Sequence, residues 1–219
     1  SNFEILEIKG GGGITHDITG LAGLTSLKAS GALTGAIVVT DLAEAAEVDI
    51  SAAIGNNLTI NQINSAGGSD TLTVDFSGGT YTTGGSIIAP NIETVTLKTS
   101  NNNTSTKTLS EGTFANAGNI TIEATSGHLT ILNLTAVNID TLDLSSSNRN
   151  VSITTGTDVF SQAFTFTGGS RNDTLDLDGA TVAAGTVFVV GEDQDVLILN
   201  ADAVSTTVRT VATDSSPTC

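Results

Sequence analysis

Internal repetition is the feature of this 219-residue chain that most restricts its fold. Residues 91–103, NIETVTLKTSNNN, align without a gap on residues 138–150, NIDTLDLSSSNRN, at an offset of 47 residues. A shorter theme, Asn followed by an apolar residue, a hydroxyl residue and Ile, begins at positions 57, 119 and 150. Recurring segments of this kind are typical of repeat architectures, in which each repeat buries its apolar face against the next.

Short runs that alternate branched apolar residues with Thr or Ser occur from end to end, for example NLTINQI, DTLTVDF, HLTILNL and AFTFTG. Each predicts a half-buried strand of about five residues, and clusters of Gly, Asn, Asp and Ser separate the runs. The one candidate helix is TDLAEAAEVDISAAIG, residues 40–55, where Asp41 is suited to cap the start and Gly55 falls where a helix would end. The competing interpretation of this segment is a surface loop.

The sequence therefore predicts an all-β protein, and matching motifs in successive strands favour a β-solenoid, either a parallel β-helix or a β-roll-like stack with degenerate rungs. A β-sandwich is the alternative, because it also produces short strands with regular turn signals. We expect one elongated domain over residues 1–219 that is a fragment of a larger protein, with a sub-boundary near residues 104–112.

The charge balance restricts the partners of this chain. Lys and Arg total 7 against 23 Asp and Glu, so the net charge is −16. Binding to nucleic acid needs a basic surface, and attraction to an anionic membrane needs clustered Lys and Arg, so neither partner is expected. No apolar run approaches the length of a membrane span, and membrane insertion is not expected either. An acidic chain instead favours hard cations, which bind oxygen ligands.

The segment GGSRNDTLD, residues 168–176, carries the chemistry that we expect. It follows the pattern G-G-x-G-x-D-x-U-x of calcium-binding nonapeptides in a parallel β-roll, with Arg171 in place of the third glycine. Glycines allow the turn to bend through positive φ and expose carbonyl oxygens, Asp173 supplies a carboxylate, and Leu175 points inward. Arg171 is also a candidate counter-charge that would replace a metal.

Two further segments share this skeleton. VGEDQDVLI, residues 190–198, places its Asp 22 residues after Asp173, a longer spacing than the 18 of two perfect nonapeptides. GGSDTLTVDFSGG, residues 67–79, is a shorter copy. We therefore expect Ca²⁺ at isolated sites, the alternative being solvated turn carboxylates. The candidate ligands are Asp70, Asp75, Gly168, Ser170, Asp173, Asp176, Asp178, Asp193 and Asp195.

These segments resemble the repeats-in-toxin family of calcium-binding proteins. Together with NIETVTL, NIDTLDL and LTSLKASGALTG, they are similar to the repeat-rich regions of bacterial surface-layer proteins and large secreted adhesins. The resemblance implies type I-like secretion, an extracellular location on the bacterial cell surface, folding that depends on calcium, and self-assembly into a homo-oligomer or two-dimensional lattice.

The expected function is therefore that of a structural component of a bacterial surface layer, with calcium stabilising turns and contacts. One alternative is a calcium-stabilised adhesin module that binds a protein or a cell-surface polysaccharide through loops such as residues 99–106. The other is a polysaccharide-degrading β-helix enzyme. An enzyme is not expected, because Trp is absent, Lys and Arg are scattered singly, and neither His16 nor His128 lies in a nucleophile motif. Cys219 is assigned no role.

Overall fold

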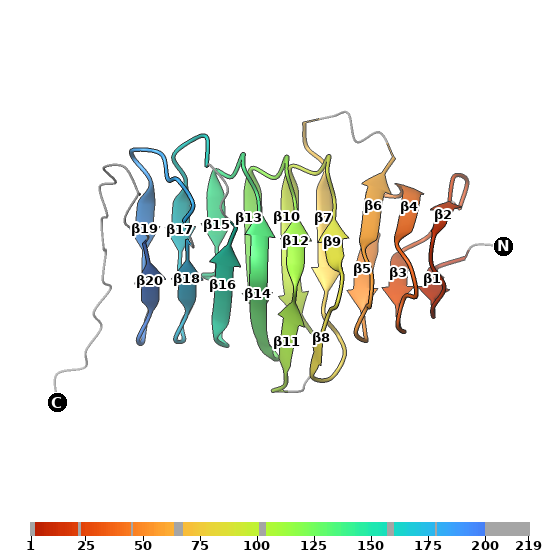
Figure 1. Cartoon of the computed structure of the whole chain (residues 1–219), viewed down its shortest axis with the longest axis horizontal. Helices are drawn as coiled ribbons and strands as arrows, with labels where there is room; N and C mark the ends of the chain where they lie inside the picture. The colour runs from red at the N-terminus through yellow and green to blue at the C-terminus, as the bar shows by residue number, and fades with distance from the viewer. Residues whose placement is uncertain are drawn as a thin grey trace.

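The computed structural model describes residues 3–21, 23–44, 46–63, 68–100, 104–156, 160–177 and 179–199. These residues form an all-β protein without a helix, in which parallel strands stack as a β-solenoid of about eight turns. The rungs follow one another along the long axis from the N-terminus to the C-terminus (Figure 1). The predicted β-solenoid is confirmed, and the alternative β-sandwich is wrong, because every strand pairing in the described residues is parallel.

Each rung contributes strands to two sheets, which we call sheet A and sheet B. Within the described residues, sheet A has nine strands and sheet B has eleven. Sheet A consists of β1 (Ile5–Ile8), β3 (Ser26–Ala29), β5 (Glu47–Ile50), β7 (Thr71–Asp75), β10 (Thr94–Thr99), β13 (Asn119–Ala124), β15 (Thr141–Asp143), β17 (Thr165–Thr167) and β19 (Val187–Val189). Sheet B consists of β2 (Ile14–Asp17), β4 (Ile37–Leu42), β6 (Leu58–Gln62), β8 (Tyr81–Thr82), β9 (Ser86–Ile88), β11 (Thr106–Leu109), β12 (Glu111–Thr113), β14 (His128–Thr135), β16 (Val151–Thr155), β18 (Thr174–Asp176) and β20 (Val196–Ile198).

Alternation within the strands explains how the two sheets enclose a core. In β10, Val95 and Leu97 are fully buried, while Thr94 and Thr96 are half-buried on the outward side. Successive side chains of a strand point to opposite faces, so the apolar positions of both sheets meet inside the solenoid. The core is continuous along the stack. At its C-terminal part it contains an aromatic chain, since the ring centroids of Phe164 and Phe188 lie 5.8 Å apart.

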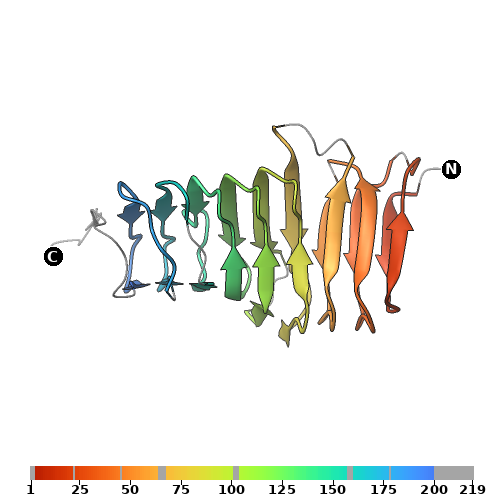
Figure 2. The ribbon, with the colours of Figure 1, turned by 45° about the horizontal axis from the view of Figure 1, so that its top comes forward.

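The sequence repeat corresponds to the rungs. Thr94 pairs with Asn119, which pairs with Thr141, so the two segments that align at an offset of 47 lie two rungs apart. Figure 2 shows the strands of successive rungs lying side by side in this way. A rung therefore spans about half of the offset detected in the sequence, and the intervening rung of β13 carries the Asn-apolar-hydroxyl-Ile theme instead.

The predicted helix over residues 40–55 is wrong. The segment contains the end of β4, a turn, and β5. Leu42, Val48 and Ile50 are all fully buried in the core of the solenoid. Burial of these side chains between neighbouring rungs outweighs the weak helix preference of the alanine-rich stretch. Asp41, predicted to cap the helix, instead lies inside β4 with a positive φ of 63°.

The segment 104–112, where a sub-boundary is predicted, includes β11 and the beginning of β12. Both strands pair with β14, and β11 also pairs with the short strand β8. In this region β8 and β11 thus form an additional pair of strands in sheet B, outside the main order of its strands.

Candidate functional site

The predicted calcium motif at residues 168–176 forms a corner between β17 of sheet A and β18 of sheet B. Asp173 lies directly before β18, and its side chain is only 2% exposed. Its Oδ1 accepts a hydrogen bond from the backbone N–H of Val151 at 2.9 Å, and its Oδ2 accepts one from the N–H of Gly169 at 2.7 Å. The carboxylate therefore joins its own turn to the start of the strand in the preceding rung.

The second predicted motif repeats this arrangement one rung later. Asp195 Oδ1 accepts a hydrogen bond from the backbone N–H of Asp173 at 2.9 Å. The spacing of 22 residues between the two aspartates equals the offset between the paired strands β18 and β20. We call Asp173 and Asp195 the corner carboxylates. Their spacing is therefore the length of a rung, and it does not come from two nonapeptides.

Burial changes the acidity of the first corner carboxylate. Removal of Asp173 from water raises its pKa from 3.8 to about 6, because the charged form loses hydration. The two backbone N–H groups lower the pKa and the charge of Asp195 raises it, and both effects are smaller than that of burial. The Oδ2 atom of Asp195 is buried and has no hydrogen-bond partner.

The glycines of the two motifs allow the backbones of neighbouring rungs to lie close together. A Cβ atom on Gly191 would lie 1.7 Å from the carbonyl oxygen of Gly169, and one on Gly168 would lie 2.7 Å from the backbone nitrogen of Gly191. None of these three glycines has a positive φ. The expectation that they bend the turn through positive φ is therefore wrong, and their function is to let the backbones of neighbouring corners touch.

The other predicted ligands at this corner have protein partners. The Ser170 hydroxyl donates a hydrogen bond to the carbonyl oxygen of Ser147 at 3.2 Å. Arg171 lies 3.5 Å from the exposed carboxylate of Asp193, so the arginine supplies a local counter-charge as the sequence suggested. Asp176 is half-buried in β18 and also has an interaction partner. Asp178 lies outside the described residues.

Asp70 and Asp75 do not join this corner, because Asp70 lies directly before β7 of sheet A and Asp75 is the last residue of that strand. Each side chain is 5% exposed. Asp75 accepts hydrogen bonds from the backbone N–H of Ser100 at 3.1 Å and from the Ser100 hydroxyl. Burial raises the pKa of Asp75. The backbone N–H of Asp70 donates to Glu93 Oε2 at 2.9 Å, while Asp70 Oδ2 is buried without a partner.

Sequence reasoning missed three polar side chains that accept or donate hydrogen bonds between rungs: Asn57, Gln62 and Glu93. Gln62, at the end of β6, donates its amide to the carbonyl oxygen of Thr71 at 2.6 Å, and its buried Oε1 has no partner. Asn57 Oδ1 accepts a hydrogen bond from the backbone N–H of Ser86 at 3.1 Å. The signal for Asn57 was present, because it begins one copy of the Asn theme directly before a strand. Glu93 and Gln62 carry no such signal.

In the described part of the chain, no three His, Cys, Asp or Glu side chains gather into a group that could hold a metal ion. The described candidate carboxylates thus lie at separate places in the fold: Asp173 and Asp195 before strands of sheet B, Asp70 before β7 of sheet A, and Asp75 at the other end of β7. Single carboxylates at these places remain candidates for sharing an ion with amide or backbone oxygens.

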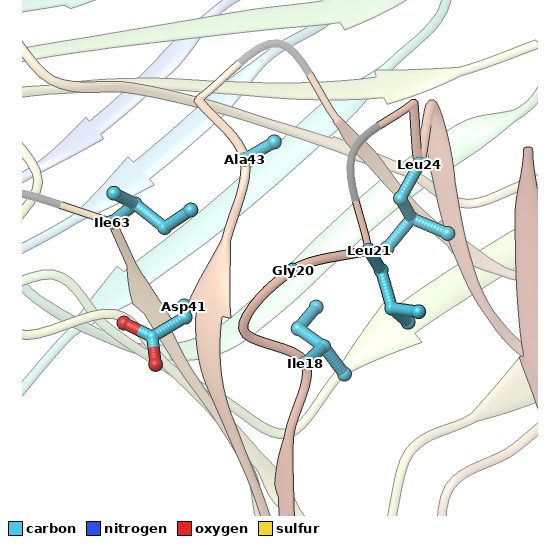
Figure 3. A pocket seen from close by; sticks show the side chains of 7 residues that line it. All are labelled: Ile18, Gly20, Leu21, Leu24, Asp41, Ala43 and Ile63. Carbon is cyan, nitrogen blue, oxygen red and sulfur yellow. The ribbon is translucent and has the colours of Figure 1, made fainter. Parts of the chain in front are cut away.

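A small pocket of about 170 Å³ lies near the N-terminal end of the solenoid (Figure 3). Its wall is apolar apart from Asp41, whose Oδ2 accepts a hydrogen bond from the Thr19 hydroxyl at 2.5 Å. A second depression of about 320 Å³ is lined largely by the glycine-rich corner and contains Glu192. Each lining contains a single carboxylate, so neither presents the pair of carboxylates that glycoside hydrolysis requires. The first pocket is lined by Ile18, Gly20, Leu21, Leu24, Asp41, Ala43 and Ile63.

Comparison of this chain with known proteins found no relative. No protein-family model, curated protein or solved structure matches this chain. Among the described residues, no helix is long and apolar enough to cross a membrane.

Proposed function

We propose that this chain is a structural component of a bacterial surface layer, which assembles with copies of itself outside the cell and uses calcium to stabilise turns and contacts. The continuous stack of parallel rungs is the observation that carries the proposal. In a solenoid each repeat packs on its neighbours, which produces an extended body with long regular faces. Such a body is suited to spanning and tiling a surface.

Contacts between rungs support a mechanical role for the solenoid. The corner carboxylates accept backbone N–H groups from the preceding rung, and Asp75 does the same with Ser100 of the following rung. Hydrogen bonds to charged groups are stronger than those between neutral groups. These contacts hold the corners in register, in addition to the strand pairing and the continuous core.

The carboxylates differ in how well they fit calcium. Both oxygens of Asp173 and both oxygens of Asp75 already accept hydrogen bonds, so an ion there would have to compete with backbone donors. Asp70 and Asp195 each have a buried carboxylate oxygen without a partner. A buried charge without a partner is costly, and a bound cation removes that cost. We therefore assign calcium to Asp70 and Asp195. The free Oε1 of Gln62 is a further candidate oxygen, because the Gln62 amide donates to the carbonyl oxygen of Thr71, the residue after Asp70.

Calcium would also counter the net charge of −16. A chain so acidic repels itself when it is compact, and neutralised carboxylates reduce that repulsion. An ion that binds only the folded state, at a concentration a hundredfold above its dissociation constant, contributes about 2.7 kcal/mol per site. Calcium outside the cell would therefore favour both folding and association, and exposed carboxylates of neighbouring copies would be joined by shared ions.

Sedimentation velocity and electron microscopy of the full chain, in millimolar calcium and in chelator, test this proposal. We expect ordered sheets or large oligomers in calcium and monomers in chelator. The double variant Asp70→Asn/Asp195→Asn should need more calcium to assemble. Glu4→Gln/Glu44→Gln is the matched control, because it also removes two charges, here from exposed side chains. Monomers of unchanged stability under both conditions would contradict the proposal.

The same preparations distinguish the alternatives. Retention on a glycan column by a chain that stays monomeric in calcium would favour an adhesin module. Release of reducing sugar or unsaturated products from a polysaccharide would favour an enzyme. Either result, without self-association, would replace the surface-layer proposal.

A further inference from the structure

The outward face of sheet A carries two adjacent rows of threonine. One row contains Thr71, Thr94, Asn119, Thr141 and Thr165, which pair in that order across five neighbouring strands. The row two residues further along each strand contains Thr73, Thr96, Thr121, Asp143 and Thr167. Eight of these ten positions are threonine. We call these ten residues the threonine array.

The array is regular and rigid. None of the strand pairings that build it contains a register shift. Neighbouring strands lie about 4.7–4.9 Å apart, and alternate residues of one strand lie roughly 6.6 Å apart, so the array is a two-dimensional lattice. The β-branched side chain restricts χ1, which repeats the same orientation of hydroxyl and methyl groups. Fully buried residues such as Val95 and Ile120 support the array from inside.

The hydroxyl groups of the array have no protein partner. Among the described residues, none of the eight threonine side chains makes a hydrogen bond within the protein. The hydroxyls are therefore left to bind water. The interior of the array is uncharged apart from Asp143, which accepts a hydrogen bond from the backbone N–H of Ser145 at 2.9 Å. Lys98 and Glu123 lie beyond the second row, at its border.

From this geometry we propose that the threonine array binds ice. Fixing a liquid water molecule on a protein costs up to about 2 kcal/mol of entropy, whereas water in ice is already fixed. A face of regularly spaced hydroxyl and methyl groups can therefore hold an ordered layer of water that joins the crystal. The spacing of neighbouring strands is close to the repeat between equivalent oxygens in hexagonal ice. Strong charges would orient water around themselves, and the array has only one.

Sheet B provides an internal control. Its outward row of Thr130, Ser152 and Thr174 ends at Val196, and the pairing of β14 with β16 shifts register between Ile131 and Leu134. Among the described residues of this face, no second row of threonine lies in register. We expect ice binding on sheet A alone.

The experiment compares three proteins: the full chain, Thr96→Tyr/Thr121→Tyr in the centre of the array, and Thr130→Tyr/Thr174→Tyr on sheet B. Tyrosine is well tolerated on a sheet surface, so folding should persist, and circular dichroism at low temperature verifies it. Each protein is tested for thermal hysteresis, inhibition of ice recrystallisation, and enrichment in slowly grown ice. We expect activity in the full chain and in the sheet B variant, and its loss in the sheet A variant.

Two results would overturn the proposal. One is a folded full chain that is inactive in all three assays. The other is a folded sheet A variant that is as active as the full chain. A second copy of the chain is the competing occupant of the array, and sedimentation velocity under the assay conditions tests for it. If the full chain forms dimers that the sheet A substitutions dissociate, and shows no ice activity, the array serves protein association. The outcome is independent of the calcium and surface-layer proposals, because it requires only the folded solenoid.

Discussion

The two sheets of the solenoid are built by the same rungs, yet they differ in regularity. In the part of the chain that the structure describes, every pairing in sheet A keeps its register, whereas sheet B shifts register between Val39 and Leu42 and again between Ile131 and Leu134. Sheet B also holds the side strands β8 and β11. An insertion in a rung must be absorbed somewhere, and in this molecule it is absorbed by bulges and loops around sheet B, which leaves sheet A as a uniform surface.

The irregularity of sheet B has a local conformational signature. Asp41 lies at one register shift with a φ of 63°, a conformation that is unfavourable for residues other than glycine. Its carboxylate accepts the hydroxyl of Thr19 and lines the apolar pocket of Figure 3. The register shift in β4 therefore coincides with a strained backbone conformation.

The largest expected loss of stability comes from truncating a buried leucine under each sheet. Leu97→Ala in sheet A should lower the free energy of unfolding by about 3–5 kcal/mol, because the rigid neighbours cannot fill the cavity. Leu134→Ala, beside the register shift of sheet B, should cost less, since a bulged strand can move inward. Both leucines are almost fully buried. Urea unfolding of the two variants measures the difference, and a greater loss for Leu134→Ala would contradict the comparison.

The addition of a methyl group to a corner glycine should cause the next largest loss of stability. Gly191→Ala forces the carbonyl of Gly169 away from its rung, and we expect a loss of about 1–3 kcal/mol, as for other overpacked sites. Gly68→Ala is the control, because a Cβ atom there would contact nothing within 4 Å and φ is not positive. Thermal unfolding compares them. Equal melting temperatures would show that the corners are looser than their geometry implies.

The pH dependence of stability tests the buried carboxylate beside sheet B. The folded pKa of Asp173 is raised from 3.8 to about 6, so between these values the folded state keeps a proton that the unfolded chain has released. The contribution of Asp173 to stability should therefore be greatest below about pH 4 and fall as the pH rises to about 6. This contribution is at most on the order of 3 kcal/mol, because one pKa unit corresponds to about 1.4 kcal/mol.

Urea unfolding between pH 4 and pH 7 measures this contribution. Asp173→Asn should flatten that part of the profile, whereas Glu44→Gln should leave it unchanged. Burial also raises the pKa of Asp75 beside sheet A, so Asp75→Asn should flatten part of the same profile. An unchanged profile in the Asp173 variant would show that this carboxylate titrates normally.

The smallest expected loss of stability concerns Asp41, the residue with positive φ in β4. Asp41→Ala should destabilise the protein by about 1 kcal/mol, because it loses the Thr19 hydrogen bond and leaves a side chain at positive φ. Asp41→Gly should be more stable than Asp41→Ala, since glycine adopts this φ without strain. Chemical unfolding of both variants provides the ranking. The reverse order would place the strain elsewhere in β4.

Much of the fold was predictable because strands and rungs have local signals. Alternation of apolar and hydroxyl residues gave strands such as β7 and β14, and the aligned segments indicated stacked repeats. The error over residues 40–55 arose because alanine favours a helix locally, while the burial of Val48 and Ile50 depends on neighbouring rungs. The length of a rung was also hidden, since the strongest alignment skips one rung.

The candidate site was only partly predictable. The sequence correctly singled out Asp173 and Asp195 as related positions, but their relation is a stack of corners and not a nonapeptide turn. The glycines were selected by backbone contact between rungs, which a motif within one rung cannot show. The unpartnered oxygens of Asp70 and Gln62 depend on the meeting of sheet A with sheet B, for which no local pattern exists.

A crystal structure at high resolution, grown in millimolar calcium, tests the proposed role of the acidic residues most directly. We expect an ion bound to the free carboxylate oxygen of Asp70 or Asp195, with Asp173 still accepting the N–H groups of Val151 and Gly169. Calcium bound to Asp173 in place of those N–H groups, or only water and arginine around all of these aspartates, would contradict the account.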